Sequence, residues 1–110
     1  MRSWVAQMRK GLIELCVLGV LRDGEAYGYQ LLQRLGEADG LSISESTVYP
    51  ILARLAEDGM IKVRVAPSPT GPPRRYYRLT TLGQDRLKEM LTYWKDIRLA
   101  VEKFHKGEQA

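Results

Sequence analysis

Five basic side chains lie in a stretch of the chain that contains no carboxylate. The stretch runs from residue 59 to residue 84 and holds Lys62, Arg64, Arg74, Arg75 and Arg78. Of 17 basic and 13 acidic groups, removing these five leaves 12 against 13, so the net charge of +4 arises here. Cations gathered without counter-charges can neutralise the phosphates of a polyanion. A face that only keeps a protein soluble would mix both signs.

The chain offers few groups for covalent or metal chemistry. Cys16 is the single cysteine, so no internal disulfide can form, and the chain suits a reducing cytoplasm. We expect Cys16 to fill core space rather than to sense redox state. His105 is the single histidine, with no second histidine or cysteine nearby to complete a metal site. We therefore expect no metal and no cofactor.

Motifs typical of enzymes and of membrane proteins are missing from the sequence. It contains no G-x-S-x-G, no P-loop and no G-x-G-x-x-G, so we expect no enzymatic activity. The apolar residues 12–21 are too few to cross a bilayer and include Glu14. At 110 residues the chain holds one domain, or one domain plus a long appended element. We expect a cytoplasmic protein that contacts no membrane.

Two helices are predicted in the first third of the chain. Apolar residues at helical spacing predict a first helix over residues 2–22, and its second half is apolar enough to be a central buried element. The pair Asp23 and Gly24 breaks the pattern. A second, short helix is predicted over residues 27–36.

A third helix is predicted up to Gly59, beginning between residues 42 and 46. Ser42, Ser44 and Ser46 are alternative caps for its first turn. Pro50 conflicts with a start at Ser44, because proline lacks the amide that the second turn needs. We therefore expect a later start or a local kink.

Two alternating segments flank a loop that is rich in proline. Residues 60–65 alternate apolar side chains with basic ones, and residues 75–80 are rich in tyrosine. Four of the five prolines lie in the loop of residues 66–73. The pattern predicts a two-stranded hairpin. The prolines keep the loop extended and unable to pair onward, so we expect it to project as a stiff wing.

A long helix is predicted from a cap at Thr80 or Thr81 to about residue 106. Its apolar residues recur at alternating spacings of three and four, which is typical of a coiled-coil seam. Such a helix extends beyond the body of so small a domain and needs a partner, which we expect to be a second copy of the chain. The seam comprises Leu87, Met90, Trp94, Ile97, Val101 and Phe104.

Three helices, a basic hairpin and a long apolar helix are the element order of a winged helix-turn-helix with a dimerisation arm. The expected fold class is mainly α with a small β wing. We assign residues 1–80 to a DNA-binding domain and residues 81–110 to a dimerisation helix. In such folds the recognition helix enters the major groove of double-stranded DNA, and here that helix is the third.

The side chains expected to contact DNA come from this third helix and from the wing. The helix presents hydroxyl groups and one guanidinium, whereas the wing cations anchor the protein on phosphates. An alternative is that the serines only cap and Tyr49 only packs. The expected residues are Ser46, Thr47, Tyr49 and Arg54 on the helix, with Lys62, Arg64, Arg74 and Arg75 on the wing.

Three segments resemble a known family. Residues 26–31 are A-Y-G-Y-Q-L, residues 47–61 are T-V-Y-P-I-L-A-R-L-A-E-D-G-M-I, and residues 74–83 are R-R-Y-Y-R-L-T-T-L-G. This combination closely resembles the PadR family of bacterial transcriptional regulators, and within it the short subfamily whose single C-terminal helix makes the dimer. The Y-P of the second segment also accounts for Pro50.

The resemblance implies a homodimeric repressor on a pseudo-palindromic operator, released by a small aromatic effector. In similar short members an aromatic residue at the position of Trp94 stacks on a flat ligand at the centre of the dimer. The alternative for Trp94 is that it only fills the seam. The effector positions implied by the resemblance are Met8, Gly11, Leu12, Leu15, Leu91, Trp94 and Arg98.

The charge of the effector and the function of the winged helix each leave an alternative. Arg98 would repel a cationic ligand, so we favour a neutral or anionic aromatic effector. A winged helix can also serve as a protein-interaction adaptor without specific DNA binding, with its long helix docked on a different protein.

Overall fold

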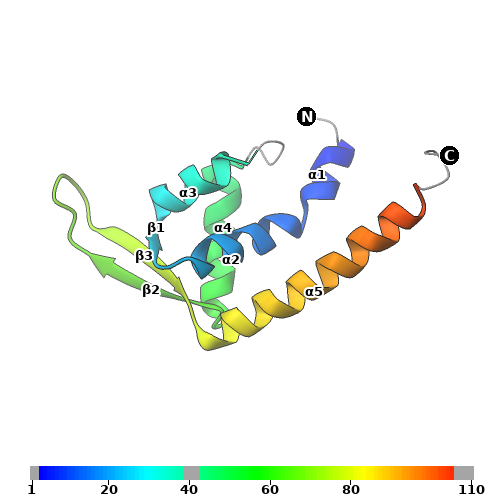
Figure 1. The fold of residues 1–110 in the computed structure, drawn as a ribbon. Coiled ribbons are helices and arrows are strands. Elements are labelled where there is room, and N and C mark those ends of the chain that lie inside the picture. The colour runs from blue at the N-terminus through cyan, green and yellow to red at the C-terminus, as the bar shows by residue number, and fades with distance from the viewer. Residues whose placement is uncertain (1–2, 39–42, 106–110) are drawn as a thin grey trace.

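The computed structural model describes residues 3–38 and 43–105. Within them it contains five helices and one three-stranded antiparallel sheet (Figure 1). The predicted fold class, mainly helical with a small β wing, is confirmed. The elements are α1 (Ser3–Arg9), α2 (Leu12–Arg22), β1 (Ala26–Tyr27), α3 (Gly28–Gly36), α4 (Glu45–Glu57), β2 (Ile61–Ala66), β3 (Arg74–Leu79) and α5 (Thr81–Lys103).

The first predicted helix is two helices. Gly11 has a φ of 88° and separates α1 from α2, so the prediction of one helix over residues 2–22 is wrong. Glycine adopts this left-handed conformation without the steric cost that other residues meet. None of the residues of α1 is buried, whereas α2 buries Ile13, Val17, Leu18 and Leu21. The expected central position is confirmed for α2.

The third predicted helix is α4, and it begins within the predicted range. Ser44 is its N-cap, and the Ser44 carbonyl accepts hydrogen bonds from the amides of Thr47 and Val48. Pro50 therefore lies inside the helix, so of the two expectations, a later start or a local kink, the later start does not hold. The side chain of Ser44 makes no capping bond to the backbone, and Ser46 lies within the helix. Ser42, the other cap considered, lies outside the described residues.

The hairpin is present with the predicted strands. β2 and β3 pair from Ile61 opposite Leu79 to Ala66 opposite Arg74. A third strand, β1, adds to the other edge of β3, which gives the order β1-β3-β2. The sequence did not predict β1, because two residues are too few to show an alternation.

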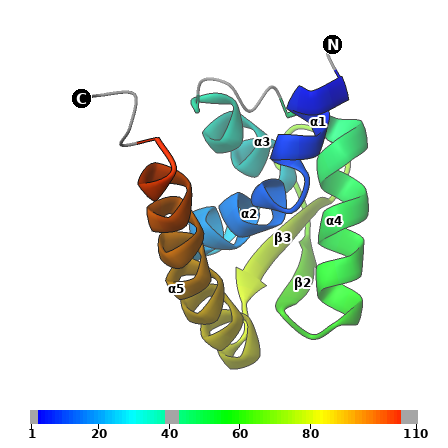
Figure 2. The ribbon, with the colours of Figure 1, turned by 90° about the vertical axis from the view of Figure 1, so that its right-hand side faces the viewer.

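The core lies where α2 packs against the other helices and the sheet. Figure 2 shows α2 between α5 and α4, with the sheet behind it. The core includes Leu18, Leu31 and Leu52, which are almost completely buried. No helix among residues 3–38 and 43–105 is both long and apolar enough to pass through a membrane.

The long helix α5 is fixed at its start and projects at its end. The Thr80 hydroxyl accepts a hydrogen bond from the Gly83 amide at 3.0 Å, which confirms Thr80 as the cap. From there α5 passes α2 and extends beyond the sheet (Figure 1), so that the molecule measures 58 × 32 × 21 Å. The helix ends at Lys103; the predicted end near residue 106 lies outside the described residues.

Candidate nucleic-acid interface

The helix predicted to enter DNA buries one side and exposes the other. Val48, Leu52 and Leu55 of α4 are packed into the core. These buried residues recur at the helical period, so the residues between them must face outward. The four residues of α4 that the sequence singles out are all exposed: Ser46, Thr47, Tyr49 and Arg54.

Hydroxyl groups gather at the beginning of α4. The Ser44 hydroxyl lies 2.9 Å from the Ser46 hydroxyl and 3.3 Å from that of Thr47. A hydroxyl group can both donate and accept hydrogen bonds, so each of these groups retains capacity towards an added partner. Because α4 begins here, the helix dipole places partial positive charge at the same point.

Tyr49 stands where α4 meets the beginning of α3. A Cβ atom at Gly28 would come within 2.7 Å of the Tyr49 hydroxyl oxygen, so this position of the ring depends on glycine at 28. The exposed part of the Tyr49 ring faces a cavity of about 630 Å³ between α3, α4 and the wing loop. The cavity is lined by Tyr27, Gly28, Tyr29, Tyr49, Ser68, Thr70, Gly71, Pro72, Pro73, Arg74, Arg75 and Tyr77.

Arg54 already has a partner in the folded chain. Its guanidinium lies 2.6 Å from a carboxylate oxygen of Glu14 on α2. The Glu14 side chain is 20% exposed and that of Arg54 is 58% exposed, so the pair connects α4 to α2 at the edge of the core. The sequence did not predict this ion pair, because Glu14 and Arg54 lie 40 positions apart.

The structure brings three of the four predicted wing cations to one face of the sheet and places the fourth on the other face. Side chains alternate between the two faces of a strand. On β3, Arg74 and Arg75 must therefore point to opposite faces. The pairing places Lys62, Arg64 and Arg74 on the outer face, with Tyr76 and Arg78. Arg75 lies on the face that packs against the helices, which also carries the buried Tyr77.

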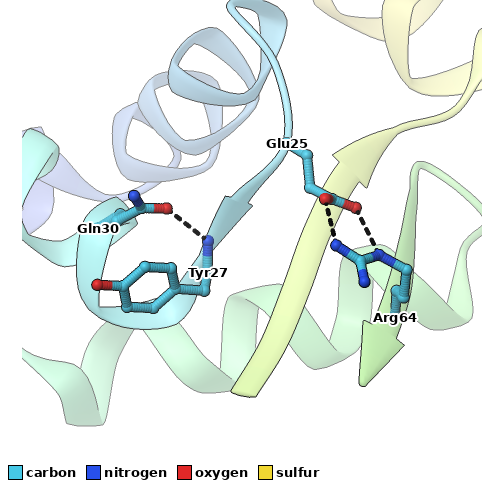
Figure 3. A network of polar contacts seen from close by, with 4 residues as sticks. All are labelled: Glu25, Tyr27, Gln30 and Arg64. Atoms are coloured by element: carbon cyan, nitrogen blue, oxygen red, sulfur yellow. Dashed lines mark hydrogen bonds and ion pairs between the residues drawn. The ribbon is translucent and has the colours of Figure 1, made fainter. Parts of the chain in front are cut away.

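On the outer face an ion pair spans the sheet. The guanidinium of Arg64 crosses β3 to reach the carboxylate of Glu25, which precedes β1 (Figure 3). The two hydrogen bonds measure 2.7 and 3.2 Å. The hydrogen bond from Arg64 lowers the pKa of the Glu25 carboxyl group. The same hydrogen bond raises the pKa of the Arg64 guanidinium.

Arginine and tyrosine side chains stack around this ion pair. The Arg64 guanidinium carbon lies 4.5 Å from the centre of the Tyr76 ring, and that of Arg74 lies 4.3 Å from the Tyr27 ring. The two rings meet edge to face with centres 5.6 Å apart. At the start of α3 the Tyr27 amide donates to the Gln30 side chain at 3.1 Å (Figure 3).

A wide apolar groove runs between α5 and the first two helices. Its volume is about 1030 Å³. Six of the seven predicted effector positions line it: Met8, Gly11, Leu12, Leu15, Trp94 and Arg98. The seventh, Leu91, does not line this groove but a different cavity, together with Leu21 and Leu87.

The groove also contains residues that the sequence did not single out. Tyr93 is exposed and lines the groove. The charged residues Lys10, Arg86 and Glu89 also line it. A heptad pattern assigns only every third or fourth residue, so Tyr93, next to Trp94, was missed. Arg98 lies 2.9 Å from Glu102, four residues on, which offsets the cationic charge that we expected to repel a cationic ligand.

The predicted seam of α5 divides into a buried part and an exposed part. Leu87 is 3% exposed and belongs to the core of its own chain, so it is not available to a second copy. Met90 is half-buried against that core. The other four seam residues are exposed: Trp94, Ile97, Val101 and Phe104.

Cys16 packs against the core and is half-buried. Burial raises the pKa of its thiol, which disfavours the reactive thiolate. This environment supports a packing role for Cys16.

A family model for the PadR-like transcriptional regulators matches residues 17–89. This chain belongs to that family. The match runs from α2 into α5 and contains all of α4 and the hairpin. The expected family membership and the winged-helix fold are thereby confirmed.

Two named relatives support the membership. The negative transcriptional regulator PadR of Bacillus subtilis is 32% identical over 82 residues, which cover 73% of this chain and 45% of that protein. Transcriptional regulator Rv3488 of Mycobacterium tuberculosis is 34% identical over 85 residues, which cover 76% of each chain.

Solved structures show the same architecture. A PadR family transcriptional regulator from Eggerthella lenta superposes with a TM-score of 0.83 at 33% identity, covering 94% of this chain and 90% of that one. The crystal structure of Bacillus subtilis PadR in complex with operator DNA gives 0.65 at 31% identity, covering 74% and 47%.

Proposed function

We propose that the protein is a homodimeric, sequence-specific DNA-binding regulator that represses transcription and is released by a small aromatic effector. The likeness to Bacillus subtilis PadR, which is solved on operator DNA, is the observation that carries this proposal. The exposed hydroxyl groups at the beginning of α4 supply donors and acceptors for base edges.

The exposed part of the α5 seam supports a homodimer. Four large apolar side chains on one helix are costly to leave in water, because burying each of them fully contributes about 1.5–3 kcal/mol. Pairing two arms would also present two α4 helices to one duplex. For successive major grooves they must stand about 34 Å apart.

The groove beside Trp94 supports an effector site. It is bounded by helices on two sides and by apolar side chains on most of its surface. A planar aromatic molecule would stack on the ring of Trp94, a residue that is 39% exposed. Binding there would release DNA only if the ligand prefers the dimer in which the two α4 helices are out of register with the grooves.

DNA binding is tested with duplexes selected from a random pool by the purified full chain. We expect the selected sequence to be a pseudo-palindrome, with an affinity that falls linearly in a plot of log K against log salt concentration. Fluorescence anisotropy measures both quantities. A chain that retains no duplex, or binds all duplexes alike, would contradict the proposal and favour the adaptor alternative.

Effector binding is tested by quenching of tryptophan fluorescence with a panel of planar aromatic molecules. The chain has two tryptophans, and Trp4 is exposed, so the measurement uses the Trp4→Phe variant and reports Trp94 alone. We expect saturable quenching by at least one molecule, which also lowers the affinity for the selected duplex. Quenching without any change in DNA affinity would contradict release by an effector.

A further inference from the structure

The wing cations have different surroundings, although the sequence shows them as one cluster. Arg64 is surrounded on the outer face of the sheet. One edge of its guanidinium is taken by both oxygens of Glu25, and its plane lies over Tyr76. A guanidinium held in this way by a carboxylate is a poor ligand for an added phosphate. It connects the two outer strands across the central one (Figure 3).

Arg75, unlike Arg64, is not held by a carboxylate of the described residues. It is exposed, and none of the carboxylates that the structure describes forms an ion pair with it. It lines the cavity between the wing loop and α4, together with Tyr49. Burial raises the pKa of the neighbouring Tyr77, and the positive charge of Arg75 opposes that shift. Arg75 is thus an unpaired cation facing the space between wing and recognition helix.

The structure assigns the two arginines to different tasks. We infer that Arg75 binds a backbone phosphate of the duplex between the wing and α4, with the Tyr49 hydroxyl as a second donor, whereas Arg64 and Glu25 brace the wing. The inference rests on the proposed function, because it presumes that a duplex occupies this space. It replaces the expectation that every cation of the wing contacts phosphate.

The test compares the removal of one charge from each face of the same strand. Arg75→Gln removes a cation from the face towards α4, and Arg78→Gln removes one from the outer face, so both variants change the net charge equally. The double variant Glu25→Gln with Arg64→Gln removes the brace without changing net charge. The affinity of each full-length variant for the selected duplex is measured by anisotropy at several salt concentrations.

We expect Arg75→Gln to reduce the magnitude of the salt slope by about 1.8, which is 0.9 for each of two protomers. Tyr49→Phe should weaken binding several-fold without changing the slope. Arg78→Gln and the double variant should keep the slope within about 0.3 of the original, because they release no phosphate contact. Circular dichroism confirms that each variant is folded under the conditions of the titration.

Two results would overturn the inference while leaving the proposed function intact. One is a salt slope that Arg75→Gln leaves unchanged. The other is an equal loss of slope in Arg75→Gln and in the double variant, which would show that Arg64 also contacts phosphate. A wild-type chain that binds no duplex would instead overturn the proposed function, and with it the inference.

Discussion

At the scale of single residues, the packing of the start of α5 against the rest of the domain depends on Gly83. A Cβ atom at this position would overlap the carbonyl oxygen of Met60 and come within 3.1 Å of the Leu79 side chain. Its amide also caps α5 through Thr80, whose hydroxyl lies 2.6 Å from the Gly59 carbonyl oxygen. The end of α4, the start of β2 and the start of α5 therefore meet at a point with no space for a side chain.

We expect Gly83→Ala to lower the free energy of unfolding by about 1–3 kcal/mol, because the added methyl group must displace backbone. Gly19→Ala is the matched control, since Gly19 lies inside helix α2 and a Cβ there meets no atom within 4 Å. Alanine at 19 should leave stability unchanged or raise it by up to about 1 kcal/mol. Urea denaturation measures both, and equal effects at the two positions would contradict the assigned role of Gly83.

At the scale of elements, the short strand β1 needs support from side chains. Only Ala26 and Tyr27 pair with β3, and a strand of two residues has few backbone hydrogen bonds to hold it. The ion pair between Glu25 and Arg64 connects the residue before β1 to β2, on the far side of β3. The brace therefore connects β1 to the hairpin, although Glu25 and Arg64 lie 39 positions apart in the sequence.

This brace should weaken in acid. The pKa of Glu25 in the folded chain lies below its ordinary value of 4.5, so the stabilisation is complete above pH 4.5 and is lost as the pH falls through the lowered pKa. We expect amide hydrogen exchange in β1 to accelerate below pH 4.5, relative to the intrinsic rate at each pH. In Glu25→Gln this relative rate should already be raised at neutral pH and change little in acid. A relative rate in the wild type that does not change below pH 4.5 would contradict the role of the ion pair.

At the scale of the whole molecule, the arm leaves the domain with its apolar seam exposed. α5 is 23 residues long, or about 35 Å, and only its first part is covered by the core of its own chain. The outer part forms one wall of the groove beside α1. In the proposed dimer, association would cover these side chains and close the groove around a ligand.

We expect Ile97→Asp to dissociate the dimer, because it would place a charge within the proposed apolar interface. Leu99→Asp is the matched control. Leu99, like Ile97, is an exposed aliphatic residue of α5, but it does not line the groove. Sedimentation velocity at micromolar concentration measures both variants. Dimers that persist in Ile97→Asp, or dissociate equally in Leu99→Asp, would contradict the proposed interface.

Local patterns predicted most of the elements of this fold. The spacing of apolar residues gave α2, α3, α4 and α5, and alternation on either side of a proline-rich loop gave the hairpin. These signals are strong because each extends over several turns of helix or several residues of strand. Where a single residue decided the outcome, prediction was less certain of the bounds: Gly11 divides the predicted first helix into two, and Pro50 lies inside α4 without delaying its start.

The sequence by itself determined the family, the order of the longer elements and the location of the positive charge, because these depend on residues that are near one another in the chain. Only the tertiary structure decided which side chains share a surface. It buried Leu87, placed Leu91 in the lining of a different cavity, paired Arg54 with Glu14, and placed Arg64 and Arg75 on opposite faces of one hairpin. The physical reason is that partners such as Glu25 and Arg64 lie 39 positions apart, and only the folded backbone brings them together.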